Sequence, residues 1–489
     1  MHQKISDTVA KEILRLHNTQ MDVSEIAQLL SLKKMQVSAI IAYFTAPAGE
    51  EVPASDGNGT GADAREPDVS EVDDHDLAPS AIVEEYSTPA DVPVVPSPAV
   101  SGPRPPEEPE ADREGIFIGN DKEYGDALYW NPQRAATVQN PHMMIVGESG
   151  SGKTYALQCL TAELAQRALP TIIFDYAQGF ELDTLDDVYK KYVKVCEYRI
   201  GEEGISLNPL QIFPKDIKGP ASVATRLSDV FDAVYHVGHI QRKVLIEAIL
   251  STFERAGILT TAPATWKNDA PNFGQLQQVL DELASDKEYP NAKNAVGLAA
   301  RLTPFFMLSS FSSGDDGWSW ASLIADPEHR VHILQFRGLE GKTQKVMLEI
   351  LLWHLFFYLK SHGQDKLRLY CVLDEAHHLS FREGGPIDLL LREARKFGLG
   401  IIFASQQPED FSEVAFSNSA SKLVFQTTDP NLKVSRFISV KCSNYESPEQ
   451  IHDVIAVLKQ GDALFVTENR GHEVRIADLR TRATQWGEA

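Results

Sequence analysis

The residues best suited to chemistry lie in the segment GESGSGKT, which runs from Gly147 to Thr154. It satisfies the pattern G-x-x-x-x-G-K-[ST] of a phosphate-binding loop and lies between an apolar run and a helix-forming run. Glycines let the backbone wrap a polyphosphate with its N–H groups inward, at the positive end of the following helix. Lys153 would then reach the β and γ phosphates, and the Thr154 hydroxyl would bind Mg²⁺. The alternative, a chance match that binds no nucleotide, is disfavoured by the correct flanks.

The residues expected to surround ATP are Gly147, Glu148, Ser149, Gly150, Ser151, Gly152, Lys153, Thr154 and Tyr155.

An acidic pair, Asp374 and Glu375, follows the apolar run LYCVL. Such a run is typical of a buried strand, whose carboxyl end would deliver both acids to the phosphate-binding loop. Asp374 would then hold Mg²⁺ through water and Glu375 would polarise the attacking water. The alternative is a solvated acidic pair at an ordinary strand end.

A glutamine, Gln406, ends the next apolar run and is placed to sense the γ-phosphate or the water. Gln407 is a second candidate. A plain turn before Pro408 is the structural alternative.

The elements that position these residues indicate an α/β fold. Continuous apolar runs at 171–176 and 331–336 are typical of parallel strands covered on both faces by helices. Amphipathic segments predict a large helical insertion at about 215–325, and residues 343–360 predict an apolar helix against the sheet. We therefore expect a P-loop NTPase (RecA-like/ASCE) core with a mainly parallel sheet, within an ATPase domain at 114–489.

The N-terminal part of the chain differs from this core. Residues 1–45 predict a small all-α domain whose helix spacing suggests a helix-turn-helix, with Lys33 and Lys34 at the start of the recognition helix. A three-helix protein-interaction module is the alternative. Residues 46–113 are rich in Pro, Ala and acidic residues, and they predict a disordered tether. A regulatory role of the tether is the alternative to a spacer.

Charge and cysteine content limit the function further. The net charge of the 489 residues is −23, but residues 46–114 hold 18 acidic and 3 basic residues, so most of it belongs to the tether. Nucleic-acid binding would therefore use local basic loops. The four cysteines form no C-x-x-C pair, so no zinc site or disulfide framework is expected. No apolar run is long enough to span a bilayer, which favours a cytoplasmic protein without membrane insertion.

The motifs together resemble the HerA/FtsK superfamily of ring ATPases, especially its HerA-like branch and the related conjugative and secretion ATPases. The segments GESGSGKT, LDEAHHL, LLREARKFGLGIIFASQQPEDF and FSNSASKLVFQTTDP carry the resemblance. It implies a hexamer with ATP between subunits and an arginine that reaches the neighbour's γ-phosphate. Arg395 matches that arginine, with Arg392 as its competitor, and Arg470 or Arg475 would act in cis. A basic residue near a helix C-terminus is also favoured by the dipole alone.

The resemblance implies an ATP-driven motor that translocates or unwinds double-stranded DNA. The chain lacks the substantial N-terminal β-barrel usual in HerA proteins, which favours an anti-phage, restriction or mobile-element system with a partner nuclease. The alternatives are a peripheral secretion or conjugation ATPase and a nucleotide-gated assembly switch. A metal site at His377 and His378 is not expected, because adjacent histidines on a helix point to different faces.

Overall fold

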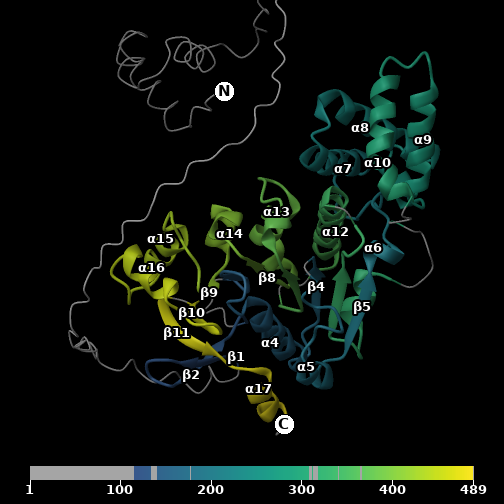
Figure 1. Cartoon of the computed structure of the whole chain (residues 1–489). Helices are drawn as coiled ribbons and strands as arrows, with labels where there is room; N and C mark the ends of the chain where they lie inside the picture. Colours follow the sequence, from purple (N-terminus) through teal and green to yellow (C-terminus); the bar gives the residue numbers. More distant parts are fainter. Residues whose placement is uncertain are drawn as a thin grey trace, which may run out of the picture. The chain divides into compact units, whose positions relative to one another are not determined.

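The computed structural model describes residues 115–133, 140–176, 178–307, 311, 318–339, 341–363, 366–467 and 469–487. The predicted helix-turn-helix at 1–45 and the predicted tether at 46–113 lie outside these residues. The described residues all lie within the predicted ATPase domain (Figure 1).

A single mixed sheet organises the described residues. Its eleven strands lie in the order β2-β1-β11-β10-β9-β3-β8-β7-β4-β6-β5. The stretch from β9 to β5 is parallel, and β10, β11, β1 and β2 extend it as antiparallel strands. The strands are β1 (Ile116–Asp121), β2 (Ala127–Trp130), β3 (Met143–Val146), β4 (Thr171–Asp175), β5 (Val195–Arg199), β6 (Val331–Gln335), β7 (Leu369–Leu373), β8 (Leu399–Ser405), β9 (Ser421–Phe425), β10 (Asp462–Thr467) and β11 (Arg470–Ile476).

Helices cover the sheet on both faces. The α-helices are α4 (Lys153–Gln166), α5 (Asp187–Tyr192), α6 (Ile200–Glu203), α7 (Pro220–Tyr235), α8 (Gly238–Arg255), α9 (Phe273–Ser285), α10 (Ala292–Met307), α11 (Trp320–Ala325), α12 (Gly341–His362), α13 (Pro386–Glu393), α14 (Glu413–Asn418), α15 (Lys433–Ser439), α16 (Pro448–Ala456) and α17 (Leu479–Trp486). None of the helices in the described ranges is both long and apolar enough to cross a bilayer.

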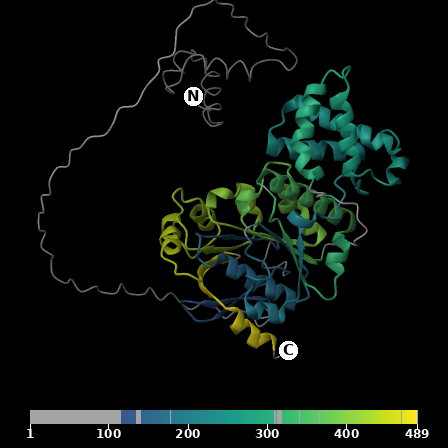
Figure 2. The same ribbon diagram turned by 45° about the vertical axis from the view of Figure 1, so that its right-hand side comes forward.

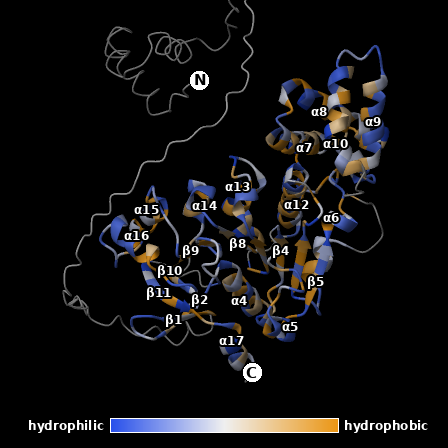
Figure 3. Ribbon diagram, in the orientation of Figure 1, coloured by the Kyte–Doolittle hydropathy of each residue, from blue (hydrophilic) through white to orange (hydrophobic). Residues whose placement is uncertain are grey.

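The apolar runs produce a doubly covered sheet because their side chains alternate between two cores. In β3, Met144 and Val146 belong to one buried cluster, whereas Met143 and Ile145 belong to the other. Strands β3, β4, β6, β7 and β8 are buried along their whole length. Figure 3 shows the hydrophobic colour concentrated on central strands such as β4 and β8. This confirms the predicted fold of a mainly parallel, P-loop NTPase-like sheet.

The helical insertion forms a lobe of its own around α7, α8, α9 and α10. Helix α7 packs on α8, α9 packs on α10, and α7 also contacts α12, which lies against the sheet. Figures 1 and 2 both show this lobe beyond α12, away from the strands.

Two local features lie outside the patterns described above. After β4 the chain contains β5, a half-buried edge strand that pairs with β6. Helix α13 ends at Glu393, and the chain continues as a 3₁₀ turn, Ala394–Phe397, which Gly398 closes at φ 75°. Strands β10 and β11 pair antiparallel, and β1 pairs with both β2 and β11.

Candidate active site

The phosphate-binding loop joins the carboxyl end of β3 to the first turn of α4. Gly150 and Gly152 have φ of 78° and 112°, in a region that side chains rarely adopt. A Cβ on Gly147 would lie 2.5 Å from the Cβ of Phe425, so the loop could not pass β9 with a larger residue. The glycines are therefore required by backbone geometry and by close packing, as the motif predicts.

Neighbouring strands hold this loop in place. The N–H of Gly147 donates to Ser405 O (3.3 Å), at the end of β8. The N–H of Glu148 donates to Gln426 O (2.8 Å), and the Glu148 carboxylate accepts from the N–H of Thr428 (2.9 Å). Because the end of β8 and the segment after β9 both anchor the loop, it is organised before any nucleotide binds.

Lys153 lies at the start of α4 and is buried, with 7% of its surface exposed. Its Nζ donates to the backbone oxygen of Glu148, 3.0 Å away. Burial lowers the pKa of the ammonium, and the negative charges of Glu375 and Asp374 oppose that shift. The charged amine is therefore folded back on the loop, with a carbonyl that a phosphate oxygen can replace.

Asp374 and Glu375 follow β7, as predicted. Burial, reinforced by the charge of Glu375, raises the pKa of Asp374 to about 7. Glu375 has φ 54° and ψ 62°, a left-handed conformation that is uncommon outside glycine. Its N–H donates to Oδ1 of Asp374 (2.9 Å). Such backbone strain is typical of functional sites.

Gln406 contacts the catalytic candidate Glu375 directly. Strand β8 lies between β3 and β7, so its carboxyl end is flanked by the phosphate-binding loop and the acidic pair. The Nε2 of Gln406 donates to Oε1 of Glu375 (2.9 Å). The structure thus brings together a lysine, two acids and a glutamine from three strand ends.

Asp175 holds a loop beside the two residues predicted to bind Mg²⁺. The sequence motifs did not identify this aspartate. It ends β4, and its carboxylate accepts from the N–H groups of Gly179 (3.2 Å) and Phe180 (2.9 Å). A Cβ on Gly179 would lie 2.9 Å from Cγ2 of Thr154 and 3.7 Å from Oδ2 of Asp374. The loop held by Asp175 therefore packs against both predicted Mg²⁺ residues. Its position after a buried strand was the available sequence signal.

The phosphate-binding loop has the donors that a magnesium nucleotide requires, and it is open to solvent at Gly150. Nothing lies within 4 Å of a Cβ built on Gly150, and the buried Ser151 Oγ lacks a hydrogen-bond partner in the described part of the chain. The Thr154 hydroxyl and the Asp374 carboxylate are hard oxygen ligands of the kind that Mg²⁺ prefers. The residues present therefore fit ATP with Mg²⁺.

The two histidines after the acidic pair lie differently from the expectation. They occupy a 3₁₀ turn, Ala376–His378, and their ring centroids are 4.1 Å apart. The prediction that they point to different faces was wrong, because it assumed α-helical geometry. Among the described residues, no group of three or more His, Cys, Asp or Glu side chains could hold a metal ion.

Arg395 lies on the 3₁₀ turn before β8, at the amino ends of the parallel strands, whereas the phosphate-binding loop lies at their carboxyl ends. Burial lowers the pKa of His142, the residue directly before β3, and the positive charge of Arg395 lowers it further. Arg392 Nε donates to Asp388 Oδ1 (2.7 Å), so this competitor pairs within its own helix.

The two C-terminal arginines are separated along one strand. Arg475 pairs opposite Asp462 and Arg470 opposite Thr467, which places them about 17 Å apart along β11. The guanidinium of Arg475 lies 3.3 Å from a Cβ built on Gly461, whose N–H donates to Ser151 O (3.0 Å). Arg475 is therefore next to the phosphate-binding loop and Arg470 is not.

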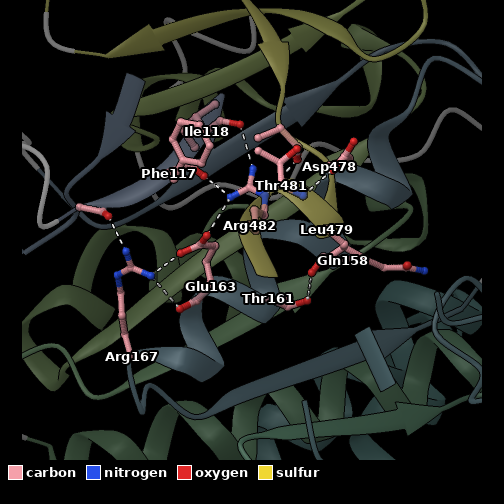
Figure 4. Close-up of polar contacts among 12 residues, drawn as sticks. Phe117, Ile118, Gln158, Thr161, Glu163, Arg167, Asp478, Leu479, Thr481 and Arg482 are labelled. Atoms are coloured by element: carbon pink, nitrogen blue, oxygen red, sulfur yellow. Dashed lines mark hydrogen bonds and ion pairs between the residues drawn. The ribbon is translucent and has the colours of Figure 1, made fainter. Parts of the chain in front are cut away.

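Tyr155 contacts the C-terminal helix. Its hydroxyl accepts from the N–H of Leu479 at the start of α17 (3.1 Å). Further along α4, the buried Arg482 of α17 donates to Oε1 of Glu163 (3.2 Å) and to Ile118 O (2.8 Å), as Figure 4 shows. Arg167 bonds the other carboxylate oxygen of Glu163. Helix α17 therefore packs on α4 through hydrogen bonds and stabilises the helix that carries Lys153 and Thr154.

Comparison with known proteins gives consistent matches. Residues 135–355 match the family described as "Helicase HerA, central domain". The "DNA double-strand break repair helicase HerA" of Sulfurisphaera tokodaii is 22% identical over 351 residues, 66% of this chain and 62% of that protein. The "DNA import protein CedB" of Sulfolobus acidocaldarius is 23% identical over 309 residues, 62% of this chain and 46% of that protein. The chain therefore spans less than two thirds of either relative.

A solved structure shares the fold. The structure of VirB4 from Thermoanaerobacter pseudethanolicus matches with a TM-score of 0.59 at 18% identity, covering 74% of this chain and 96% of that one.

Proposed function

Because residues 135–355 match the family described as "Helicase HerA, central domain", we propose that the protein hydrolyses ATP to translocate or unwind double-stranded DNA. The proposed form is a homo-hexameric ring with ATP between subunits. The printed names of the two relatives, a repair helicase and a DNA import protein, support DNA as the substrate.

The contact between Gln406 and Glu375 carries the hydrolytic part of the proposal. A glutamine 2.9 Å from the candidate base lies between the phosphate-binding loop and the acidic pair. One side chain can therefore respond to the γ-phosphate and change the partners of the base in the same movement. A loop that only bound nucleotide would not need this link.

The proposed reaction depends mainly on positioning and charge stabilisation. The loop N–H groups and Lys153 bind the phosphates. Thr154 and Asp374 would hold Mg²⁺, which would supply positive charge beside the phosphates. Glu375 accepts a proton from the attacking water, while Arg395 reaches in from the neighbouring subunit.

The setting of the motor is part of the proposal. Its four cysteines are free thiols, three of them buried, which suits a reducing cytoplasm. We place the protein in an anti-phage, restriction or mobile-element system, in which a partner nuclease would cut the DNA. The predicted helix-turn-helix at 1–45 would recruit DNA or that partner.

The test is ATP hydrolysis with and without long double-stranded DNA, for the wild type and for Glu375→Gln, with the mass measured in the same buffer. We expect DNA to stimulate turnover, and we expect Glu375→Gln to lower kcat by about 10² to 10⁴-fold. The stimulation should fall steeply with salt.

A hexamer mass together with that stimulation supports the motor. A monomer or dimer with slow turnover that ignores DNA would overturn it and favour the nucleotide-gated switch.

A further inference from the structure

The two carboxylate oxygens of Glu375 have different environments. Oε1 accepts from Gln406 Nε2 (2.9 Å), whereas the buried Oε2 accepts no hydrogen bond from the described residues. The Nδ1 of His377 lies 3.2 Å from Oε2. A small rotation of the imidazole would align its N–H with Oε2, so His377 is within reach of the oxygen that Gln406 does not hold.

A column of aromatic rings keeps His377 in this place. Its ring lies 4.1 Å from the ring of His378, which stacks on Tyr176 at 5.3 Å. Tyr176 in turn lies 4.7 Å from Phe336. Since Tyr176 follows β4 and Phe336 follows β6, two neighbouring strand ends support the histidine pair. The imidazole beside Glu375 is 45% exposed, and it is supported through His378 by residues that follow two neighbouring strands.

A base in this position needs such support. Glu375 is in the left-handed region, and the turn after it allows several side-chain directions. If Gln406 turns to the γ-phosphate, as a sensor must, Oε1 loses its only donor among the described residues and becomes free to accept the proton of water. The carboxylate would then rotate unless another group held Oε2.

We propose that His377 is a positioning residue for Glu375: its Nδ1–H holds Oε2 while Gln406 releases Oε1 to the attacking water. This inference rests on the proposed ATPase activity and adds a residue to its machinery. Holding one oxygen leaves the lone pairs of the other directed at the water, so the effect should be on turnover and not on ATP binding.

The test separates the nitrogen of His377 from its ring. His377→Phe keeps an aromatic face against His378 but has no donor for Oε2. His377→Asn lacks the ring but places an amide N–H close to the position of Nδ1. For each variant, kcat and KM for ATP are measured with saturating DNA, and the affinity for a non-hydrolysable ATP analogue is measured separately. His239→Phe, on the exposed start of α8, is the matched control.

We expect His377→Phe to lower kcat by about tenfold or more, with KM and analogue affinity within about twofold of the wild type. His377→Asn should retain most of the turnover, and His239→Phe should behave as the wild type. The reverse order, with Phe active and Asn inactive, would show that the ring only packs and would overturn the proposal. Wild-type turnover in both variants would overturn it as well. A wild type that hydrolyses no ATP would instead refute the proposed function, and the two failures are thereby distinct.

Discussion

The P-loop helix α4 carries a buried charge near each end, and the two charges have very different partners. At its start, Lys153 donates a hydrogen bond to the carbonyl oxygen of Glu148. The negative charges of Asp374 and Glu375 attract its ammonium group. About 15 Å along the helix, Glu163 is bonded by Arg482 on one oxygen and by Arg167 on the other (Figure 4).

Charged groups that exchange partners during a reaction differ from charged groups that only stabilise the fold. In a site that hydrolyses ATP, Lys153, Glu375 and Gln406 each acquire a new partner, so their present contacts are few or exchangeable. The buried Glu163 has no such role, and breaking a saturated buried pair leaves an uncompensated charge. We therefore expect substitutions at the start of α4 to lower ATP turnover with little effect on stability. Substitutions at the other end should lower stability with little effect on turnover.

The largest expected effect is on activity at the start of the helix. Lys153→Met should lower ATP turnover by at least about 10²-fold, because a charge aimed at the phosphates is lost. The melting temperature should stay within about 2 °C of the wild type, since an apolar chain of similar length replaces a buried charge. Steady-state ATPase assays and calorimetry on the same preparation check both parts. A large drop in melting temperature would contradict the comparison.

The next effect is on stability at the other end. Arg482→Met should cost about 3 to 5 kcal/mol, because Glu163 loses a partner and the carbonyls of Phe117 and Ile118 lose their donor. ATP turnover at 25 °C should remain within about threefold of the wild type, provided that the variant is folded there. Denaturant unfolding gives the free energy.

Arg167→Met is the matched control, since Arg167 pairs with the same Glu163 but is 32% exposed. We expect it to cost about 1 kcal/mol. Equal losses in the two variants would show that burial of the pair does not set its strength.

The smallest effect concerns pH at the Asp374 carboxyl. Its pKa of about 7 in the folded protein lies above the ordinary 3.8, so its protonated form stabilises the fold. That contribution is complete below pH 3.8 and is lost as the pH rises through 7. Without nucleotide and with a chelator present, the wild type should lose about 1 kcal/mol between pH 6 and 8 through this group. Asp374→Asn should lack that loss in a thermal melt. Identical pH slopes would show that the carboxyl is already ionised at pH 6.

Much of the candidate site at the carboxyl ends of β3, β7 and β8 could be predicted, because it depends on short sequence motifs and runs of apolar residues. The spacing from Gly147 to Thr154 and the run before Asp374 each specify a strand end and the residues directly after it. The contact of Gln406 with Glu375 was within reach as well, because neighbouring parallel strands end at one edge. The family match over residues 135–355 confirms the resemblance to HerA-type ATPases.

Other features escaped prediction for physical reasons. Strand β5 has the sequence VCEYR and is half-buried at the sheet edge, so it lacks the apolar run that marked the central strands. The ring contact of His377 with His378 depends on a 3₁₀ turn after a left-handed residue, which no periodicity reveals. Arg482 is 319 residues from Glu163, and its short polar helix gives no sign of burial.

The sequence by itself determined the chemistry of the nucleotide loop, the acidic pair and the alternation that builds a doubly covered parallel sheet. These follow from backbone geometry and hydrophobic pattern within short windows. Only the tertiary structure decided which charges are saturated and which remain exchangeable: Glu163 between two arginines, Lys153 on a carbonyl, and Glu375 between Gln406 and His377. Burial and pairing depend on segments hundreds of residues apart, and such distances leave no local trace in the chain.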